Sequence, residues 1–340
     1  MIVERFTAQL LAGPPAGRPE DVAERLLAVQ GQDSRGVRLA VRARTSGLTV
    51  ADVDRALTSD RSLLITWVNR GTLHMMRSED YPWLHALTTP PLLRGNERRL
   101  GQEGVSPEAA DRAVAVIERS LSDGPLTRGQ LRNRVDAAGV RTQGQALVHL
   151  LVLASLRGMI VRGPMIGGEH AYVLVRDWLG EPGPVDRDQA LAELARRYLA
   201  GHGPADDRDL AQWAGLPLRD ARAGLKAIGN ELDQRGDGLV ELAGRPRLTA
   251  SYLPPPRLLG AFDPLLLGWR SRAPIVGAAK ELVTVNGLFR PFALVEGRAV
   301  ATWSLPRGGV VLAPFAPLSP ETAAALEAEV GDVLRFLSEN

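Results

Sequence analysis

Two glutamines that flank one small residue are the first candidates for chemistry in this chain of 340 residues. An amide side chain offers an acceptor oxygen and two N–H donors, but it cannot take a proton from water. If the segment Gln30-Gly31-Gln32 is extended, positions i and i+2 project to the same side, and both amides can hold one water molecule. We expect such a pair to place water beside a carbon whose leaving group is already positively charged. The alternative is that both residues form the polar end of a helix.

Arginine dominates the positive charge. Only two of the 41 basic residues are lysines, which argues against a Schiff-base mechanism. A high-GC genome explains this bias, and so does phosphate recognition by guanidinium groups. Arg35, Arg38 and Arg42 are spaced i, i+3 and i+7, so they share one face of a helix and are predicted to contact nucleic-acid phosphates. A solvated surface face explains the spacing almost as well.

A basic hairpin is the second candidate element. Apolar runs over residues 63–68 and 72–76 surround an Arg-Gly turn sequence. We expect Arg70, Thr72 and His74 to contact nucleic acid, with a water contact as a second possibility for His74. His74 equally fits a buried core histidine whose hydrogen bonds are satisfied.

Composition excludes several classes of chemistry. The chain has no cysteine, which removes disulfides, thiolate nucleophiles and thiolate metal sites. Its five histidines show no metal-ligand spacing, so neither a metal nor a cofactor is expected. No apolar run reaches the length of a membrane span, and the N-terminus lacks a signal-peptide pattern. The sequence therefore predicts a cytoplasmic protein with no membrane partner.

A repeated order of elements predicts the fold class. Three helices and then a hairpin are expected twice, and a Gly-Pro break followed by two helices begins a weaker third pass. We predict an α+β protein built from tandem winged-helix subdomains and a β-rich C-terminal domain. The predicted domains are a first winged helix over 1–100, a second over 101–182, a third over 183–256, and a C-terminal domain with a final helix over 257–340. Nucleic acid is the commonest partner of such modules, and a protein-binding scaffold is the alternative.

Capping residues and apolar periodicity predict the individual elements. The expected helices cover residues 19–29, 33–44, 49–57, 106–121, 127–138, 142–157, 186–200, 206–214, 218–228 and 319–337. Beyond the first hairpin, the expected strands cover residues 159–162, 171–175, 239–242, 283–285, 293–295 and 300–303. The order of these elements agrees with the winged-helix interpretation.

Several motifs together resemble the AlkZ-type family of winged-helix DNA glycosylases. The matching segments are Leu27-Ala28-Val29-Gln30-Gly31-Gln32-Asp33, Thr66-Trp67-Val68-Asn69-Arg70-Gly71-Thr72-Leu73-His74, and, near the C-terminus, residues 261–269, 286–291 and 295–303. The resemblance covers nearly the whole chain in the expected order. It implies a C-shaped body around a DNA channel and the excision of alkylated bases, with crosslink unhooking by some members.

The same resemblance assigns roles to individual residues. It maps a Gln–apolar–Gln catalytic signature onto Gln30 and Gln32, with Gly31 where the family usually carries a larger residue. Asp263, Asn286 and Arg290 also match family positions, and structural hydrogen bonding is expected of them. The resemblance implies a monofunctional DNA glycosylase that acts on one class of substrate.

That class is double-stranded DNA carrying cationic N7-alkylated purines, and interstrand crosslinks are a further candidate. Such a base departs as a neutral molecule, so placing water is the task that remains. We expect the protein to act as a monomer without a cofactor. The main alternative is a non-catalytic winged-helix transcriptional regulator, and a second is a scaffold without affinity for DNA.

Overall fold

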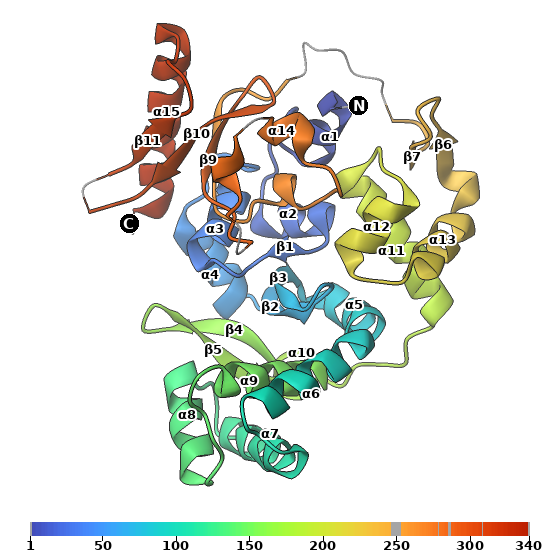
Figure 1. The fold of residues 1–340 in the computed structure, drawn as a ribbon, viewed down its shortest axis with the longest axis vertical. Coiled ribbons are helices and arrows are strands. Elements are labelled where there is room, and N and C mark those ends of the chain that lie inside the picture. The colour runs from blue at the N-terminus through green and yellow to red at the C-terminus, as the bar shows by residue number, and fades with distance from the viewer. Residues whose placement is uncertain (1, 246–252, 278, 285–286, 308, 339–340) are drawn as a thin grey trace. The chain divides into compact units, whose positions relative to one another are not determined.

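The chain folds from α-helices and antiparallel sheets, so it is an α+β protein, as the sequence predicts (Figure 1). The computed structural model describes residues 2–245, 253–277, 279–284, 287–307 and 309–338. The chain divides into two compact units. One consists of Met1–Val53 with Leu191–Asn340, and the other of Asp54–Ala190.

The first unit combines helices from both ends of the chain with short strands. Its helices are α1 (Ile2–Ala8), α2 (Pro19–Leu26), α3 (Ser34–Arg42), α12 (Asp207–Ala214), α13 (Leu218–Ala227), α14 (Ala273–Val276) and α15 (Pro320–Leu337). Its strands are β1 (Val29–Gln30), β6 (Leu232–Gln234), β7 (Val240–Leu242), β8 (Arg257–Leu259), β9 (Phe292–Val295), β10 (Arg298–Ser304) and β11 (Val311–Pro314). Two helices, α4 (Val50–Thr58) and α11 (Arg187–His202), contain the positions where the chain passes from one unit to the other.

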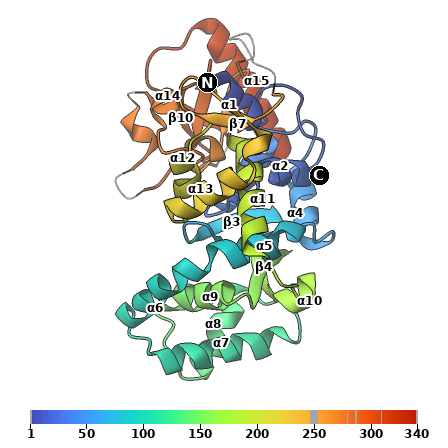
Figure 2. The same cartoon turned by 90° about the vertical axis from the view of Figure 1, so that its right-hand side faces the viewer.

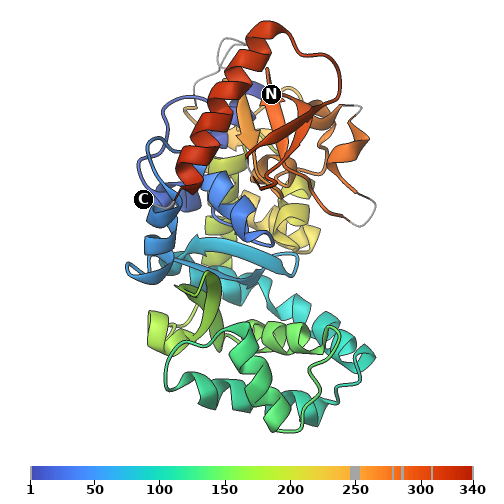
Figure 3. The same cartoon turned by 90° about the vertical axis from the view of Figure 1, so that its left-hand side faces the viewer.

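An antiparallel sheet with the strand order β11-β10-β9-β8 forms the C-terminal part of this unit. Helix α15 packs against β8, and α3 contacts both of them (Figures 1 and 3). Leu258, Phe292 and Trp303 are fully or almost fully buried in the core. The sheet and α15 therefore form the surroundings in which α3, the helix that follows the glutamine pair, is held.

The second unit contains two hairpins and the helices between them. Its helices are α5 (Tyr81–Thr88), α6 (Leu93–Gln102), α7 (Pro107–Leu121), α8 (Arg128–Ala137), α9 (Ala146–Leu156) and α10 (Val175–Leu179). Its strands are β2 (Leu63–Val68), β3 (Thr72–Arg77), β4 (Ile160–Ile166) and β5 (Glu169–Leu174).

Within this unit the two hairpins join into one sheet, in the order β3-β2-β4-β5. The junction pairs Ile65 of β2 with Arg162 of β4. Helix α9 packs against β2 and β4, and α7 packs against both α8 and α9 (Figure 2). The sequence predicts each hairpin from its own local pattern, but the pairing of one with the other is a long-range contact that this pattern does not contain.

Most predicted helices and hairpins are present. Ser106, Thr127 and Ser319 cap α7, α8 and α15 as their sequence positions predict. The helix expected over 142–157 begins later, at Ala146. The sequence missed several elements, most of them short: α1, α5, α6, α10, α14, β1, β6, β8 and β11.

The outcome is different for the strand expected over 283–285 and for the expected division into domains. The strand over 283–285 is reduced to an isolated bridge from Val283 to Phe289, and residue 285 lies outside the described residues. The four-domain division is untested and stays a prediction, although the two compact units have other boundaries. In the described part of the chain, no helix is both long and apolar enough to cross a membrane.

The backbone of helix α3 lies in direct contact with the backbone of the segment that follows β8. A Cβ atom at Gly36 would overlap the carbonyl oxygen of Ala261. One at Gly260 would lie 3.0 Å from the Cα of Gly36. Glycine at both positions lets the segment after β8 cross the first turn of α3 without an intervening side chain.

We therefore expect Gly36→Ala to destabilise the protein by about 1–3 kcal/mol, because the added methyl group has no space. In an open helical position the same change stabilises, by up to about 1 kcal/mol. Gly331 in α15 is such a position, with nothing within 4 Å of an added Cβ, so Gly331→Ala is the matched control. Urea unfolding of both variants measures the difference, and a Gly36→Ala protein as stable as the control would contradict the close contact.

Candidate active site

The two glutamines meet through a direct hydrogen bond. Gln30 ends strand β1, and its Nε2 donates to Oε1 of Gln32 at 2.5 Å. Gln30 is 6% exposed, whereas Gln32 is exposed to solvent. The pair therefore forms a polar patch with one member anchored in the interior and one reaching the surface, as projection to the same side predicts.

The pair lies outside any helix, since Gln30 ends β1 and Gln32 lies in a bend before α3. Helix α2 ends at Leu26, three residues before the end predicted for it, because Leu27 adopts a positive φ of 63° and reverses the chain. Asp33 then caps α3, its carboxylate accepting the N–H of Gly36 at 2.5 Å. Gln32 is thus followed at once by a capped helix, and Asp33, the first residue of the helix expected over 33–44, is its N-cap.

The three arginines predicted to line one face of α3 have different surroundings. Arg35 is exposed. Arg38 is buried and donates to the carbonyl of Ser34 at 2.7 Å. The third, Arg42, is buried in ion pairs with two carboxylates, Glu329 at 2.9 Å and Asp332 at 2.7 Å.

The predicted stripe is therefore not a surface stripe. A phosphate contact by Arg42 would require breaking two ion pairs, and one by Arg38 would require moving a buried side chain. The i, i+3, i+7 spacing correctly placed the residues on a helix, but it did not reveal that Arg38 and Arg42 are buried, or that α15 and β8 supply the partners of Arg42. Among these three residues the phosphate contact is carried forward as a prediction for Arg35.

The hairpin residues belong to the second unit. Arg70 lies at the tip between Asn69 and Gly71, which both have positive φ, and Thr72 begins β3. Nδ1 of His74 lies 2.9 Å from the carbonyl oxygen of Thr72. Because a carbonyl can only accept, Nδ1 carries the proton in the neutral ring and Nε2 is the acceptor.

Burial determines the charge state of His74. The ring is 1% exposed. Loss of hydration lowers its pKa to about 3, with a smaller contribution from the positive charge of Arg70. His74 is therefore neutral at physiological pH, and contact with DNA would require a local rearrangement that exposes the ring. The buried, hydrogen-bonded alternative describes its surroundings better.

Asn69 is a polar residue that the sequence did not single out. It is fully buried, and neither atom of its carboxamide has a partner among the described residues. The hydroxyls of Thr66 and Thr72 are unpartnered in the same sense. Buried polar atoms of this kind are costly and are concentrated at functional sites. The Asn-Arg-Gly sequence of the turn was the available signal, since asparagine tolerates positive φ.

The C-terminal positions that match the family have structural surroundings. Asp263 is fully buried, forms an ion pair with Arg44 at 2.8 Å and caps a short helix by accepting from Leu265. This confirms the structural hydrogen bonding expected of it. Arg290 is exposed, and its backbone N–H donates to Leu282. Asn286 lies outside the described residues.

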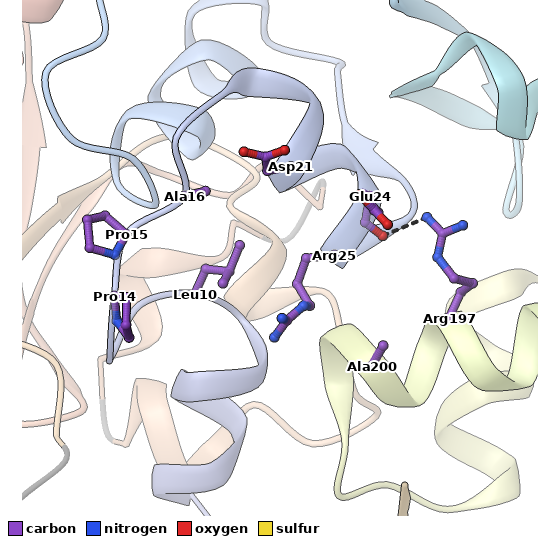
Figure 4. A pocket seen from close by; sticks show the side chains of 9 residues that line it. All are labelled: Leu10, Pro14, Pro15, Ala16, Asp21, Glu24, Arg25, Arg197 and Ala200. Atoms are coloured by element: carbon purple, nitrogen blue, oxygen red, sulfur yellow. Dashed lines mark hydrogen bonds between the residues drawn. The ribbon is translucent and has the colours of Figure 1, made fainter. Parts of the chain in front are cut away.

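A separate hollow of about 440 Å³ lies in the first unit (Figure 4). Asp21, Glu24, Arg25 and Arg197 contribute two charges of each sign to its lining. Arg197 donates to the backbone carbonyl of Glu24 at 2.6 Å. None of the predicted site residues lines this hollow. In the described part of the chain, no group of three or more histidine and acidic side chains is arranged to hold a metal ion.

Comparison with known proteins shows which family the chain belongs to. The family model described as "DNA glycosylase AlkZ-like" matches residues 23–336. The chain belongs to the AlkZ-like DNA glycosylase family. The family predicted from the motifs is therefore confirmed.

Two similar proteins come from Streptomyces sahachiroi. A curated protein named "Interstrand DNA cross-link repair glycosylase" is 28% identical over 354 residues, which cover 97% of this AlkZ-like chain and 94% of that protein. The solved structure of "DNA glycosylase AlkZ" matches with a TM-score of 0.79 and 25% identity, over 98% of this chain and 95% of that one. The match extends over nearly the full length of both chains, so the fold of the AlkZ-like chain is shared as a whole.

The lowered pKa of His74 makes a prediction about stability. The pKa of His74 in the unfolded chain is about 6.5, so below that pH the folded state binds fewer protons than the unfolded state. The stability that the neutral ring contributes is therefore fully present only above about pH 6.5. The contribution is lost as the pH falls from 6.5 towards 3, by about 1.4 kcal/mol per pH unit. Between pH 7 and pH 5 the native protein should lose about 2 kcal/mol more stability than a His74→Gln variant. Denaturant titrations at both pH values test this, and parallel losses would contradict a buried neutral ring.

Proposed function

We propose that this AlkZ-like protein is a monofunctional DNA glycosylase that hydrolyses the N-glycosidic bond of cationic N7-alkylated purines. Gln30 and Gln32 are proposed to position the attacking water. The observation that carries the proposal is the hydrogen-bonded glutamine pair at the start of α3, in a chain that belongs to a DNA glycosylase family. The name of the Streptomyces sahachiroi relative supports interstrand crosslinks as further substrates.

The chemistry fits neutral amides. Glycosidic hydrolysis ordinarily uses a carboxylic acid to protonate the leaving group and a carboxylate on the other side of the sugar. An N7-alkylated purine is already a cation, so the electrons of the breaking bond neutralise it and no acid is needed. Water forms the new bond to the anomeric carbon, and its proton passes to solvent.

The pair is suited to holding that water. A carboxamide has two donors and two lone pairs, so the hydrogen bond that Gln32 accepts from Gln30 does not exhaust the Gln32 side chain. Gln32 is exposed and can reach a substrate, while Gln30 fixes its orientation from the interior. Fixing a reactant in this way can remove several kcal/mol from a barrier. Gly31 adds no side chain between the amides, so we expect it to affect rate or substrate range more than the reaction itself.

DNA binding is proposed to use the winged-helix modules, each of which consists of three helices and a hairpin. The order α7, α8, α9, β4, β5 in the second unit is that of a winged helix, the module expected to bind double-stranded DNA. Arg35 and Arg70 are the proposed phosphate contacts, with Thr72 beside the tip of the first hairpin. The DNA channel, the monomeric state and a cytoplasmic, DNA-associated location are parts of the same proposal.

The first test replaces each glutamine. Gln30→Ala and Gln32→Ala should each slow release of N7-methylguanine from duplex DNA by about 100-fold under single-turnover conditions, because water is no longer held in place. DNA affinity should change little. Gln212→Ala, an exposed glutamine of α12, is the matched control. Tight, salt-sensitive binding without base release by the native protein would favour the regulator instead.

The second test varies the leaving group. A site without a general acid forgoes the roughly 10²–10⁴-fold that such a group contributes, so a neutral base should leave slower by at least this factor. Duplexes that differ only in carrying N7-methylguanine or uracil measure the ratio of the two release rates. Comparable rates would show that the protein supplies an acid, and the mechanism with two neutral amides would then be wrong.

A further inference from the structure

Arg44, just after α3, is the centre of a fully satisfied buried network. Its side chain is 0% exposed, and so is that of Asp263. Two parallel hydrogen bonds, of 2.8 Å and 2.9 Å, join the guanidinium to the Asp263 carboxylate. The remaining N–H groups donate to the Ala40 carbonyl and to the backbone and side-chain oxygens of Gln9. All five donors of the guanidinium are thereby used.

The segment that carries Asp263 also touches the other end of α3. Gly260 and Ala261 lie against Gly36 in the first turn, at distances that leave no space for a side chain. Asp263 is tied back to its own segment by the N–H of Leu265, which donates to it at 2.9 Å. One short segment after β8 therefore contacts α3 at its beginning and just beyond its end.

The beginning of α3 is where the glutamine pair lies. Asp33 caps the helix through the N–H of Gly36 and follows Gln32 directly. Any tilt or slide of α3 along its axis would therefore move the backbone that carries Gln32, and with it the hydrogen bond to Gln30.

We propose that Arg44 and Asp263 are positioning residues for the glutamine pair: their ion pair fixes α3 against the 260–263 segment and so fixes the direction of Gln32. The proposal rests on the proposed function of Gln30 and Gln32. Neither Arg44 nor Asp263 contacts solvent, so neither is expected to touch DNA.

The type of interaction supports this role. A bidentate guanidinium–carboxylate contact fixes both distance and angle, because two parallel bonds must be satisfied together. Apolar side chains of similar volume can replace a buried ion pair without loss of stability, but they can slide over one another. The directional contact therefore restricts movement of α3 in a way that burial alone does not.

The test removes the ion pair without leaving a buried charge. Single substitutions would strand one ion in the interior. We therefore choose the double variant R44M/D263L, because apolar replacement of both partners of a buried ion pair is often neutral for stability. The matched control is R235M/E241L. It removes another largely buried pair of the first unit, with a 3.0 Å contact, on the hairpin β6–β7, which carries no predicted site residue. Arg235 also contacts Glu4 at 3.4 Å and Asp237 at 3.5 Å, so the control loses more ionic contacts than the test variant.

Two measurements are made on the full chain of each variant. One is the single-turnover rate of N7-methylguanine release at saturating duplex, together with the dissociation constant for undamaged duplex. The other is hydrogen exchange of the amides of residues 33–40. R44M/D263L should release base about 10-fold more slowly or worse, with unchanged DNA affinity, and should exchange faster at these amides. The control should match the native protein in release rate, DNA affinity and amide exchange.

A double variant with the native release rate, or with native protection of residues 33–40, would overturn the positioning role. A loss of rate that is matched by a loss of DNA affinity would overturn it as well. Absence of base release by the native protein would refute the proposed function. The exchange measurement would then still decide whether the ion pair fixes α3, so the two failures are distinguishable.

Discussion

Burial of charge around α3 is the constraint on which the first unit depends. Arg42 and Arg44 are both buried, and an ionised group is kept out of water only where opposite charges and acceptors replace its hydration. The partners come from distant parts of the chain, Glu329 and Asp332 on α15 and Asp263 after β8. The C-terminal sheet and helix therefore bring the carboxylates without which α3 could not occupy the interior.

This arrangement has a consequence for the candidate active site. Gln30 and Gln32 are uncharged, so one of them can lie in the interior and still hydrogen-bond the other at low cost. A carboxylate at either position would be harder to bury and would act as a base or nucleophile. The charged groups nearby instead form ion pairs that hold α3 in place. Chemistry without a general acid suits the positively charged lesions that are proposed as substrates.

The second unit uses burial differently. Two hairpins complete one sheet, and the polar residues of the first hairpin, His74 and Asn69, are enclosed by it and its surroundings. Burial keeps the pKa of His74 far below physiological pH, which makes the ring a neutral acceptor at Nε2. Among the described residues the carboxamide of Asn69 has no partner, and its backbone adopts a positive φ of 55° in the turn. Such a combination is tolerated where a site needs polar groups in a dry environment.

Local patterns in the sequence determined the helices, their caps and the two hairpins. Asp33, Ser106 and Ser319 cap helices because a short polar side chain reaches the first turn from its own position. The same local logic placed the glutamines on one side of an extended segment, and the motifs together identified the family. Nothing beyond neighbouring residues was needed for these conclusions.

Tertiary structure alone decided which charges reach solvent. The spacing of Arg35, Arg38 and Arg42 describes one helical face, yet only Arg35 of the three is exposed. Arg42 is covered by elements nearly 300 residues away, which supply its carboxylate partners. His74 is likewise buried by packing that its hairpin pattern does not specify. A helical or strand period tells which residues share a face. What covers that face is set by contacts between distant segments, and these depend on the whole fold.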